Sequence, residues 1–359
     1  MIALNRPIQP NLKKLTQYLD QVHELGWYTN FGPLHQQLTE RLEEYLKVEN
    51  LLLVSNGTLA IQVACKAMNV DNALTTPFSF VATTSSLLWQ SIDVGFCDID
   101  PNSLNLSPNT ITTALQKSNN YDAIVATHVY GNPCDVKSIE QISNQYNKKV
   151  IYDAAHAFGV NVGNKSVLSF GDASTLSFHA TKVFHTVEGG AIVFKNRDDF
   201  DFAKKLINFG IESDGSLGTP GINAKLNEYQ SAVGLTLLDD IDNVLEHRIA
   251  MFELYREELN GVLEMPAWHK EATSNGAYMP VICDSEEQLK SIIDHLNVRG
   301  IQSRKYFSPS LDRAYPYCES DGCEVSQQHA SKMLCLPLHF FMTKEDVKTV
   351  ANEIREFLR

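Results

Sequence analysis

The stretch of sequence that decides the fold runs Ser177-Phe-His-Ala-Thr-Lys182-Val-Phe-His-Thr-Val-Glu188-Gly-Gly190. An apolar, strand-like run, 174–178, ends here in small and polar residues, and a lysine and a glycine pair follow it. Upstream, a second buried-strand pattern, Val150-Ile-Tyr-Asp153-Ala-Ala-His156, ends in an acid. If both runs are strands of one parallel sheet, we expect Lys182 and Asp153 at the same edge of it.

A lysine and an aspartate at the ends of two such strands are the parts that an enzyme of pyridoxal phosphate (PLP) needs. The lysine holds the cofactor aldehyde as a Schiff base, and the carboxylate keeps the pyridine nitrogen protonated. Taken singly, each residue has an ordinary interpretation, because a lysine after a strand is usually solvated and an aspartate there is often a helix N-cap. The prediction therefore depends on several such elements occurring in one order.

Length and charge exclude some classes of protein. The 359 residues are enough for a large core in one or two domains. The net charge of −13, with no basic stripe, argues against a nucleic-acid surface. No apolar run approaches the roughly twenty residues that a membrane span needs, and the first residues lack the pattern of a signal peptide. The seven scattered cysteines indicate reduced thiols, a cytoplasmic protein and no metal site.

Apolar runs alternate with helical patterns over about residues 50–210. The expected strands are 51–55, 73–76, 94–98, 123–128, 150–153, 175–179 and 191–194. Continuous apolar strands separated by helices predict an α/β fold with a mostly parallel sheet covered on both faces. A loop at 211–222, a long helix from 227 to about 259, and a smaller α+β unit follow; within that unit 301–306 and 333–336 are expected as strands. We predict a large domain, 1–240, and a small C-terminal domain, 241–359.

Other strand-to-helix junctions carry candidate cofactor contacts. At Gly57-Thr58 the backbone and a helix N-terminus would approach a phosphate, although an ordinary turn has the same sequence. An aromatic ring at Phe80 would stack on the pyridine face, and a core phenylalanine is the alternative. His156 follows Asp153 by one turn and would reach the ring oxygen, unless it is a structural histidine.

Together these elements resemble the DegT/DnrJ/StrS sugar aminotransferase family, which has the type I aspartate aminotransferase fold. The resemblance runs from about residue 25 to about 340. Its pieces are Thr29-Asn-Phe-Gly-Pro, Val54-Ser-Asn-Gly-Thr-Leu-Ala, Pro77-Phe-Ser-Phe-Val-Ala-Thr, Cys97-Asp-Ile-Asp-Pro, His128-Val-Tyr-Gly-Asn-Pro, Asp153-Ala-Ala-His-Ala-Phe-Gly, Ser177-Phe-His-Ala-Thr-Lys and Gly221-Ile-Asn-Ala-Lys-Leu-Asn-Glu-Tyr-Gln.

The resemblance implies a role for each matching position. It makes Lys182 the Schiff-base lysine and proton carrier and Asp153 the partner of the ring nitrogen, and it supplies the remaining cofactor contacts through Phe80, His156, Gly57, Thr58 and Ser177. Asn223 matches an asparagine that reaches the phosphate of the neighbouring subunit, which implies a homodimer with shared active sites. The implied reaction moves an amino group from L-glutamate to a keto nucleotide sugar through a pyridoxamine phosphate form.

Two departures from the family pattern bear on the substrate. His156 stands where the family usually has glutamine, and Lys225 replaces a common arginine. With the other differences, they resemble a subgroup that acts on dTDP-4-keto-6-deoxyglucose and forms dTDP-4-amino-4,6-dideoxyglucose for lipopolysaccharide O-antigen. A 3-keto sugar is the next expectation. Lys225, Arg304 and Tyr306 are the candidate substrate contacts, and a solvated surface position is the alternative for the basic residues.

Three other functions fit the sequence less well. A sugar dehydratase of the same family would lack the Schiff-base lysine, which is present here as Lys182. A non-catalytic PLP-binding relative would not need Lys182, Asp153 and Asn223 together. A nicotinamide oxidoreductase would require a Gly-x-Gly-x-x-Gly after an early strand, and the sequence has none.

Overall fold

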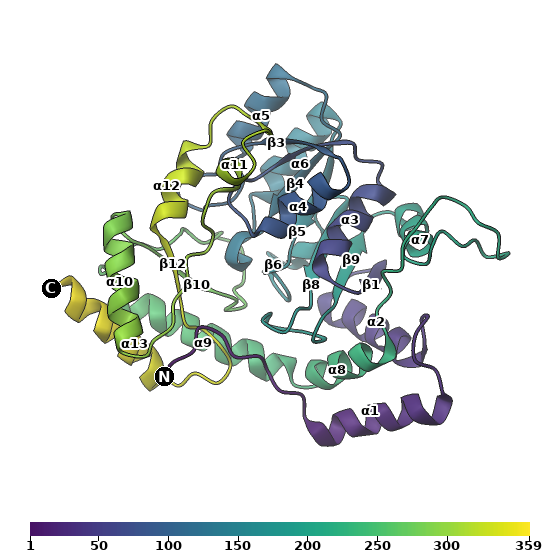
Figure 1. Cartoon of the computed structure of the whole chain (residues 1–359), viewed down its shortest axis with the longest axis horizontal. Coiled ribbons are helices and arrows are strands. Elements are labelled where there is room, and N and C mark those ends of the chain that lie inside the picture. Colours follow the sequence, from purple (N-terminus) through teal and green to yellow (C-terminus); the bar gives the residue numbers. More distant parts are fainter.

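The computed structural model describes residues 1–359 and contains a central eight-stranded sheet in the order β1-β9-β8-β5-β4-β2-β3-β11 (Figure 1). Only β9 runs antiparallel to its neighbours, which confirms the mostly parallel sheet. The strands are β1 (Leu51–Val54), β2 (Asn72–Thr75), β3 (Asp93–Phe96), β4 (Ala123–Thr127), β5 (Lys149–Asp153), β8 (Ala173–Ser177), β9 (Gly190–Phe194) and β11 (Glu319–Ser320), with a separate hairpin of β6 (Asn161–Val162) and β7 (Lys165–Ser166).

Helices cover both faces of this sheet, because successive strand side chains point to opposite faces. In β1, Leu51 and Leu53 pack with α2 and α8, whereas Leu52 and Val54 pack with α3. The helices of the first face are α2 (Pro33–Leu46), α5 (Pro108–Lys117), α6 (Val136–Tyr146) and α8 (Glu228–Leu238); those of the second are α3 (Gly57–Ala67), α4 (Val81–Trp89) and α7 (Arg197–Leu206), and α1 (Leu12–Leu25) lies outside on α8.

A separate buried cluster forms the C-terminal part of the protein, beside the sheet in Figure 1. Its antiparallel strands β10 (Met279–Ile282) and β12 (Met333–Leu336) pack against α9 (Ile241–Glu258), α10 (Glu286–Val298) and α13 (Lys344–Leu358). The short helices α11 (Leu311–Ala314) and α12 (Glu324–Lys332) connect this cluster to the sheet edge. The division at residue 240 stays a prediction.

Two sequence-based expectations are wrong in detail. The long helix is two helices, α8 and α9, which are interrupted at Asp239 and Asp240. Lys14 and Arg41 form ion pairs with Asp239 at 3.3 and 2.8 Å, and such tertiary contacts are invisible to periodicity. Residues 301–306 form no strand, since they pair only through two isolated bridges, Ile301 with Ile2 and Arg304 with Cys335. The predicted loop at 211–222 is irregular and projects beside α7 (Figure 1).

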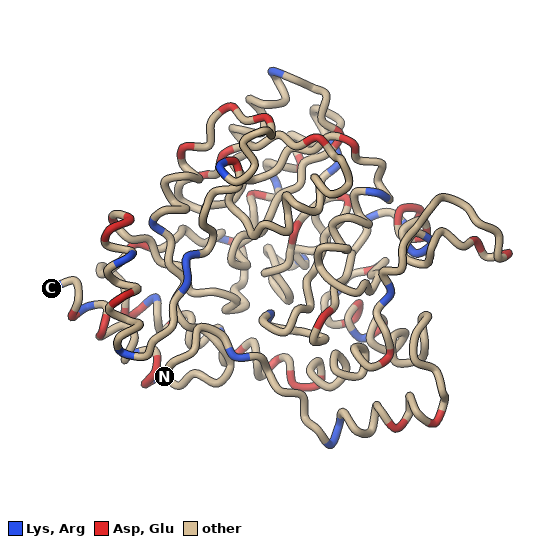
Figure 2. The backbone as a smooth tube through the Cα atoms, viewed as in Figure 1, with Lys and Arg blue, Asp and Glu red and all other residues tan.

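Charged residues of both signs are spread over the chain (Figure 2). Figure 2 shows Lys and Arg interspersed with Asp and Glu along the backbone rather than gathered in one stretch. None of the helices combines the length and apolar character needed to cross a membrane. All seven cysteines are free, and all but Cys318 are buried.

Candidate active site

The carboxyl ends of β5 and β8 open into a cavity of about 360 Å³. Binding at this edge is expected for a mostly parallel sheet. The cavity collects nearly all the residues that the sequence singled out: Gly57, Thr58, Phe80, Asp153, His156, Ser177, Lys182, Arg304 and Tyr306. Loops and strand ends far apart in the sequence therefore supply one concave site.

Lys182 lies in the loop that follows β8 and is half-buried. Burial lowers the pKa of its amine to about 8. The nearby Asp153 and Tyr306 have the opposite effect and raise this pKa, but burial is the larger influence. The amine lies 6.0 Å from the centre of the Tyr278 ring. Near pH 7 the neutral form, which a nucleophile or base requires, is thus far more populated than in an ordinary lysine with a pKa of 10.5.

Asp153 is the last residue of β5 and is only 6% exposed. Its Oδ2 accepts a hydrogen bond from the Thr83 hydroxyl at 2.6 Å, and its Oδ1 accepts one from the Ala155 N–H at 3.1 Å. Burial raises the pKa of Asp153, whereas these two donors and Lys182 lower it. Its hydrogen-bond donors are neutral, so the carboxylate can still receive a cationic partner from a ligand.

His156 stands in an aromatic wall of the cavity. Its ring is parallel to Phe307 at 5.8 Å and meets Tyr278 edge-on at 4.7 Å. Burial lowers the pKa of His156 well below its ordinary value, and Lys182 lowers it further. The buried Nδ1 has no hydrogen-bond partner. This histidine is therefore neutral, and one of its two nitrogens lacks a partner in the protein.

A phosphate cradle is formed where α3 begins beside the end of β8. Asn56 caps the helix by accepting from the Leu59 N–H at 2.8 Å. The N–H groups of Gly57 and Thr58 precede the first intrahelical donor and are available for an anion. A Cβ at Gly57 would stand 2.8 Å from the Ser177 Cβ, so only glycine allows this approach.

The remaining predicted residues divide into two groups. Phe80, directly before α4, is 53% exposed and lines the cavity. Arg304 and Tyr306 also line it, and the Arg304 guanidinium lies 5.1 Å from the centre of the Tyr306 ring. Asn223 and Lys225 are not in this cavity. Asn223 is exposed, and the Lys225 Nζ donates to the Asn208 Oδ1 at 2.8 Å.

The structure also brings in residues that the sequence analysis missed. Tyr278 and Phe307 come from the C-terminal part and carry no motif, so no sequence signal identified them. Thr83 closes the quoted stretch Pro77-Phe-Ser-Phe-Val-Ala-Thr three residues after Phe80, but Thr84 lies four residues after it, so the spacing does not single out Thr83.

These residues fit PLP. The buried carboxylate of Asp153 suits a protonated ring nitrogen, and the unpartnered Nδ1 shows that His156 has hydrogen-bonding capacity to spare. The narrow approach of Gly57 to Ser177, at a helix N-terminus, suits a phosphate. Lys182 supplies the amine that PLP chemistry requires.

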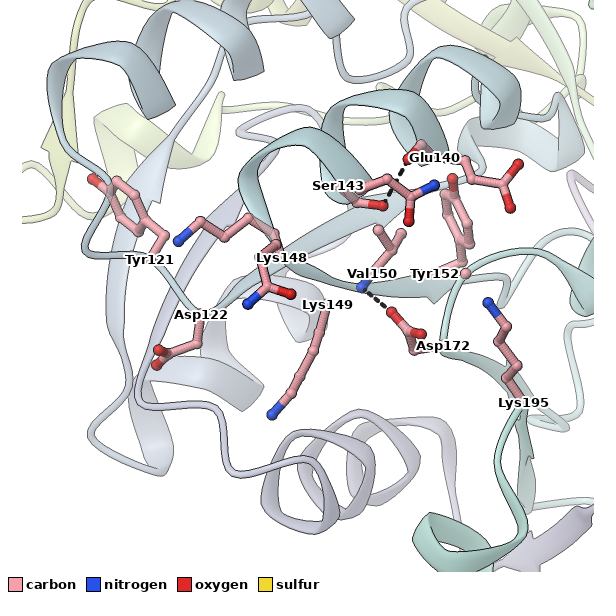
Figure 3. Close-up of a pocket in the computed structure, with 13 residues that line it drawn as sticks. Tyr121, Asp122, Glu140, Ser143, Lys148, Lys149, Val150, Tyr152, Asp172 and Lys195 are labelled. Atoms are coloured by element: carbon pink, nitrogen blue, oxygen red, sulfur yellow. Dashed lines mark hydrogen bonds between the residues drawn. The ribbon is translucent and has the colours of Figure 1, made fainter.

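A second cavity, of about 530 Å³, lies at the opposite edge of the sheet (Figure 3). Its charged groups are largely engaged by the protein. The Lys148 Nζ donates to the Asn119 carbonyl at 2.9 Å, Asp172 accepts from the Val150 N–H at 2.8 Å, and Asp122 accepts two backbone N–H groups. Tyr121 and Tyr152 also line it, but it holds none of the residues that the sequence singled out, and most of its charged groups already have partners. This cavity is therefore a weaker candidate than the one at Lys182.

Comparison with known proteins agrees with the geometry. Residues 11–355 match the DegT/DnrJ/EryC1/StrS aminotransferase family. The chain is 38% identical to dTDP-4-amino-4,6-dideoxy-D-glucose transaminase of Shigella dysenteriae, over 99% of this chain and 98% of that protein. It is 34% identical to the Escherichia coli transaminase of the same name, over 98% and 97%. The crystal structure of DesI in the presence of its TDP-sugar product superposes with a TM-score of 0.93, at 28% identity, over 99% of this chain and 93% of DesI.

Proposed function

The chain belongs to the DegT/DnrJ/EryC1/StrS aminotransferase family, and from this premise we propose that it transfers an amino group from L-glutamate to dTDP-4-keto-6-deoxyglucose. The product is dTDP-4-amino-4,6-dideoxyglucose, and the relatives from Shigella and Escherichia that carry this sugar in their names support it. The observation that carries the proposal is one cavity holding an amine of lowered pKa and a buried carboxylate, Lys182 and Asp153.

The family uses PLP, which when bound supplies an aldehyde that condenses with amines and a ring that withdraws electrons from the neighbouring carbon. In the proposal, Asp153 holds the proton on the ring nitrogen. Phe80 would cover one face of the ring and His156 would hydrogen-bond its oxygen. Gly57 and Thr58, with Ser177, would hold the phosphate through their N–H and hydroxyl groups.

Lys182 is the proton carrier of this proposal. In its neutral form the Nζ accepts a proton, and as an ammonium it returns one. The pKa of about 8 keeps both forms accessible at neutral pH, which a pKa of 10.5 would not. The packed rings of His156, Tyr278 and Phe307 on one side of the cavity would limit the access of water to this exchange.

Arg304 and Tyr306 are proposed to contact the substrates. Besides Lys182, Arg304 is the only lysine or arginine among the lining residues. Its backbone is fixed by hydrogen bonds with Cys335 in both directions, at 3.1 and 2.8 Å, while its guanidinium extends over Tyr306. Glutamate and a nucleotide sugar are both anionic, so a guanidinium at the cavity suits both.

The proposal includes a homodimer with shared sites, in the cytoplasm. Asn223 is exposed and lies outside the cavity of its own chain, which is compatible with a contact to the phosphate of a second chain; Lys225 would accompany it. Half-exposed aromatic residues, Trp27 at 49% and Tyr28 at 45%, are suited to burial against a partner. Mixing Lys182→Ala chains with Asn223→Ala chains should restore part of the activity, and two inactive variants that never complement each other would argue for self-contained sites.

The deciding experiment is a coupled assay with L-glutamate and dTDP-4-keto-6-deoxyglucose, with NMR of the product. An amine at C4, equatorial or axial, supports the proposal. An amine at C3 would mean that the substrate is a 3-keto sugar, and no transfer to any keto nucleotide sugar would refute the proposed function. Lys182→Ala should abolish turnover yet still bind pyridoxamine phosphate. Borohydride trapping and peptide mapping should label Lys182, and a label at another lysine would refute its role.

A further inference from the structure

The carboxylate of Asp153 ends a chain of three buried hydroxyl groups. Thr83 donates to its Oδ2 at 2.6 Å, Ser79 lies 2.8 Å from the Thr83 hydroxyl, and Thr127 lies 3.1 Å from the Ser79 hydroxyl. The exposed fractions of these three side chains are 0, 2 and 1%. These three hydroxyls are shielded from solvent, and their hydrogen bonds lead to one carboxylate.

The ionised carboxylate fixes the polarity of the whole chain, because it can only accept. The Thr83 hydrogen must point to Asp153, so the Thr83 oxygen accepts from Ser79, and the Ser79 oxygen in turn accepts from Thr127. All three O–H dipoles then point their positive ends toward the negative charge. Aligned hydrogen bonds strengthen one another in a low-dielectric interior.

The chain also links the elements that build the site. Thr127 and Asp153 are the last residues of the neighbouring strands β4 and β5, Thr83 lies in the first turn of α4, and Ser79 precedes that helix. Phe80 stands between Ser79 and Thr83. The spacing between the carboxylate and the aromatic ring is therefore set by the same hydrogen bonds.

We propose that Thr127, Ser79 and Thr83 form a positioning relay that keeps the Asp153 carboxylate ionised and oriented for the cofactor ring. The proposal rests on the proposed role of Asp153 at the ring nitrogen. Thr83 is the member that contacts the carboxylate, and Ser79 and Thr127 act through it. None of the three is assigned a proton transfer of its own.

The next residue of the helix provides a matched control. Thr84 is also 0% exposed and lies in the same turn of α4, but its buried hydroxyl has no hydrogen-bond partner. Thr83→Val and Thr84→Val remove the same atom and add the same methyl group, one helix position apart. A difference between the two variants therefore measures the hydrogen bond to Asp153 rather than the change of side chain.

The test is the release of PLP from the purified holoenzyme, followed by dialysis and absorbance across a range of pH. A hydrogen bond to a charged group corresponds to roughly ten- to hundredfold in an equilibrium constant, so Thr83→Val should weaken PLP retention by that factor. Thr84→Val should stay within about twofold of wild type, since it removes only an unpaired hydroxyl.

The pH profile separates an electrostatic role from a structural one. The titratable groups facing Asp153 are Lys182 and Tyr278, and His156 is neutral beside them. Loss of the Thr83 donor removes a contact that favours the ionised carboxylate, so the acid limb of PLP retention should move to higher pH in Thr83→Val. It should not move in Thr84→Val.

Two further variants keep the proposal falsifiable if Thr83→Val folds poorly. Thr83→Ser retains the hydroxyl and should restore PLP retention and its pH limb, and Ser79→Ala should show a smaller loss in the same direction. Equal retention in Thr83→Val and Thr84→Val, or a Thr83→Ser variant as weak as Thr83→Val, overturns the relay. A wild-type protein that fails to bind PLP would instead overturn the proposed function, so the two failures are distinct.

Discussion

Lys182→Met should change how the stability of the PLP-free protein depends on pH. Burial lowers the pKa of this lysine to about 8, whereas an unfolded chain has an ordinary lysine with a pKa of 10.5. Below pH 8 the folded protein must therefore hold a charged amine in a cavity that disfavours it. Methionine has a similar length and no charge, so the variant removes this destabilising term.

The sign follows from proton linkage. Between pH 8 and 10.5 the unfolded wild-type chain binds a proton at Lys182 that the folded chain has released, so the free energy of unfolding of wild type rises with pH relative to Lys182→Met. One pKa unit corresponds to about 1.4 kcal/mol, and lowering the pKa from 10.5 to about 8 makes the total change about 3 kcal/mol. At pH 7 the free energy of unfolding of Lys182→Met should exceed that of wild type, and most of this difference should be lost by pH 10.5.

Urea unfolding at fixed protomer concentration, in steps from pH 7 to 10.5, measures this difference. Lys165→Met is the control, because it replaces an exposed lysine of the same part of the chain and measures how the loss of a lysine alone changes the free energy of unfolding. The Lys182→Met difference should decline with pH after subtraction of that change. A difference that stays flat over this interval would refute the lowered pKa and with it the argument for a neutral amine.

Asp153→Asn should keep the fold and lose most of the transferase activity, because an amide cannot hold a proton on a ring nitrogen; unchanged steady-state kinetics would contradict its role. Gly57→Ala should speed the loss of PLP, since the new Cβ would stand 2.8 Å from the Ser177 Cβ, and dialysis against buffer measures it. Arg304→Gln should raise the KM for the anionic substrates more than it lowers kcat, with Lys305→Gln as the neighbouring control; a normal KM for both glutamate and the nucleotide sugar would remove Arg304 from the site.

The parallel sheet could be predicted because buried parallel strands are continuously apolar. Runs such as Leu51–Val54 and Ala123–Thr127 are too short for typical helices, and their length therefore favours strands between the helical patterns. The two-residue strand β11 could not be predicted, because its pairing with β3 comes from sheet-edge contact and not from its own residues, Glu319 and Ser320. Short elements of this kind are determined by the tertiary structure alone.

The site could be predicted where a residue follows a strand end inside a recognisable run, as Asp153 and Lys182 do. It could not be predicted where chemistry depends on partners from distant segments. Tyr278 and Phe307 reach the cavity only because the C-terminal part packs over the carboxyl ends of the strands. Nor does the sequence distinguish Thr83 from Thr84, although in the structure one hydroxyl binds a carboxylate and the other binds nothing.

Burial shifts the pKa values of Lys182 and Asp153 in opposite directions. It lowers the pKa of Lys182 and raises that of Asp153, so each is pushed toward its neutral form, while the charge of each favours the charged form of the other. Among the contacts that lower the pKa of Asp153 and so oppose burial, the hydrogen bond from Thr83 is the largest, ahead of the Ala155 N–H and the charge of Lys182. In the proposed function, a cationic ring beside Asp153 would complete this pairing and leave Lys182 free to exchange its proton, so the two residues would act together only with a ligand between them.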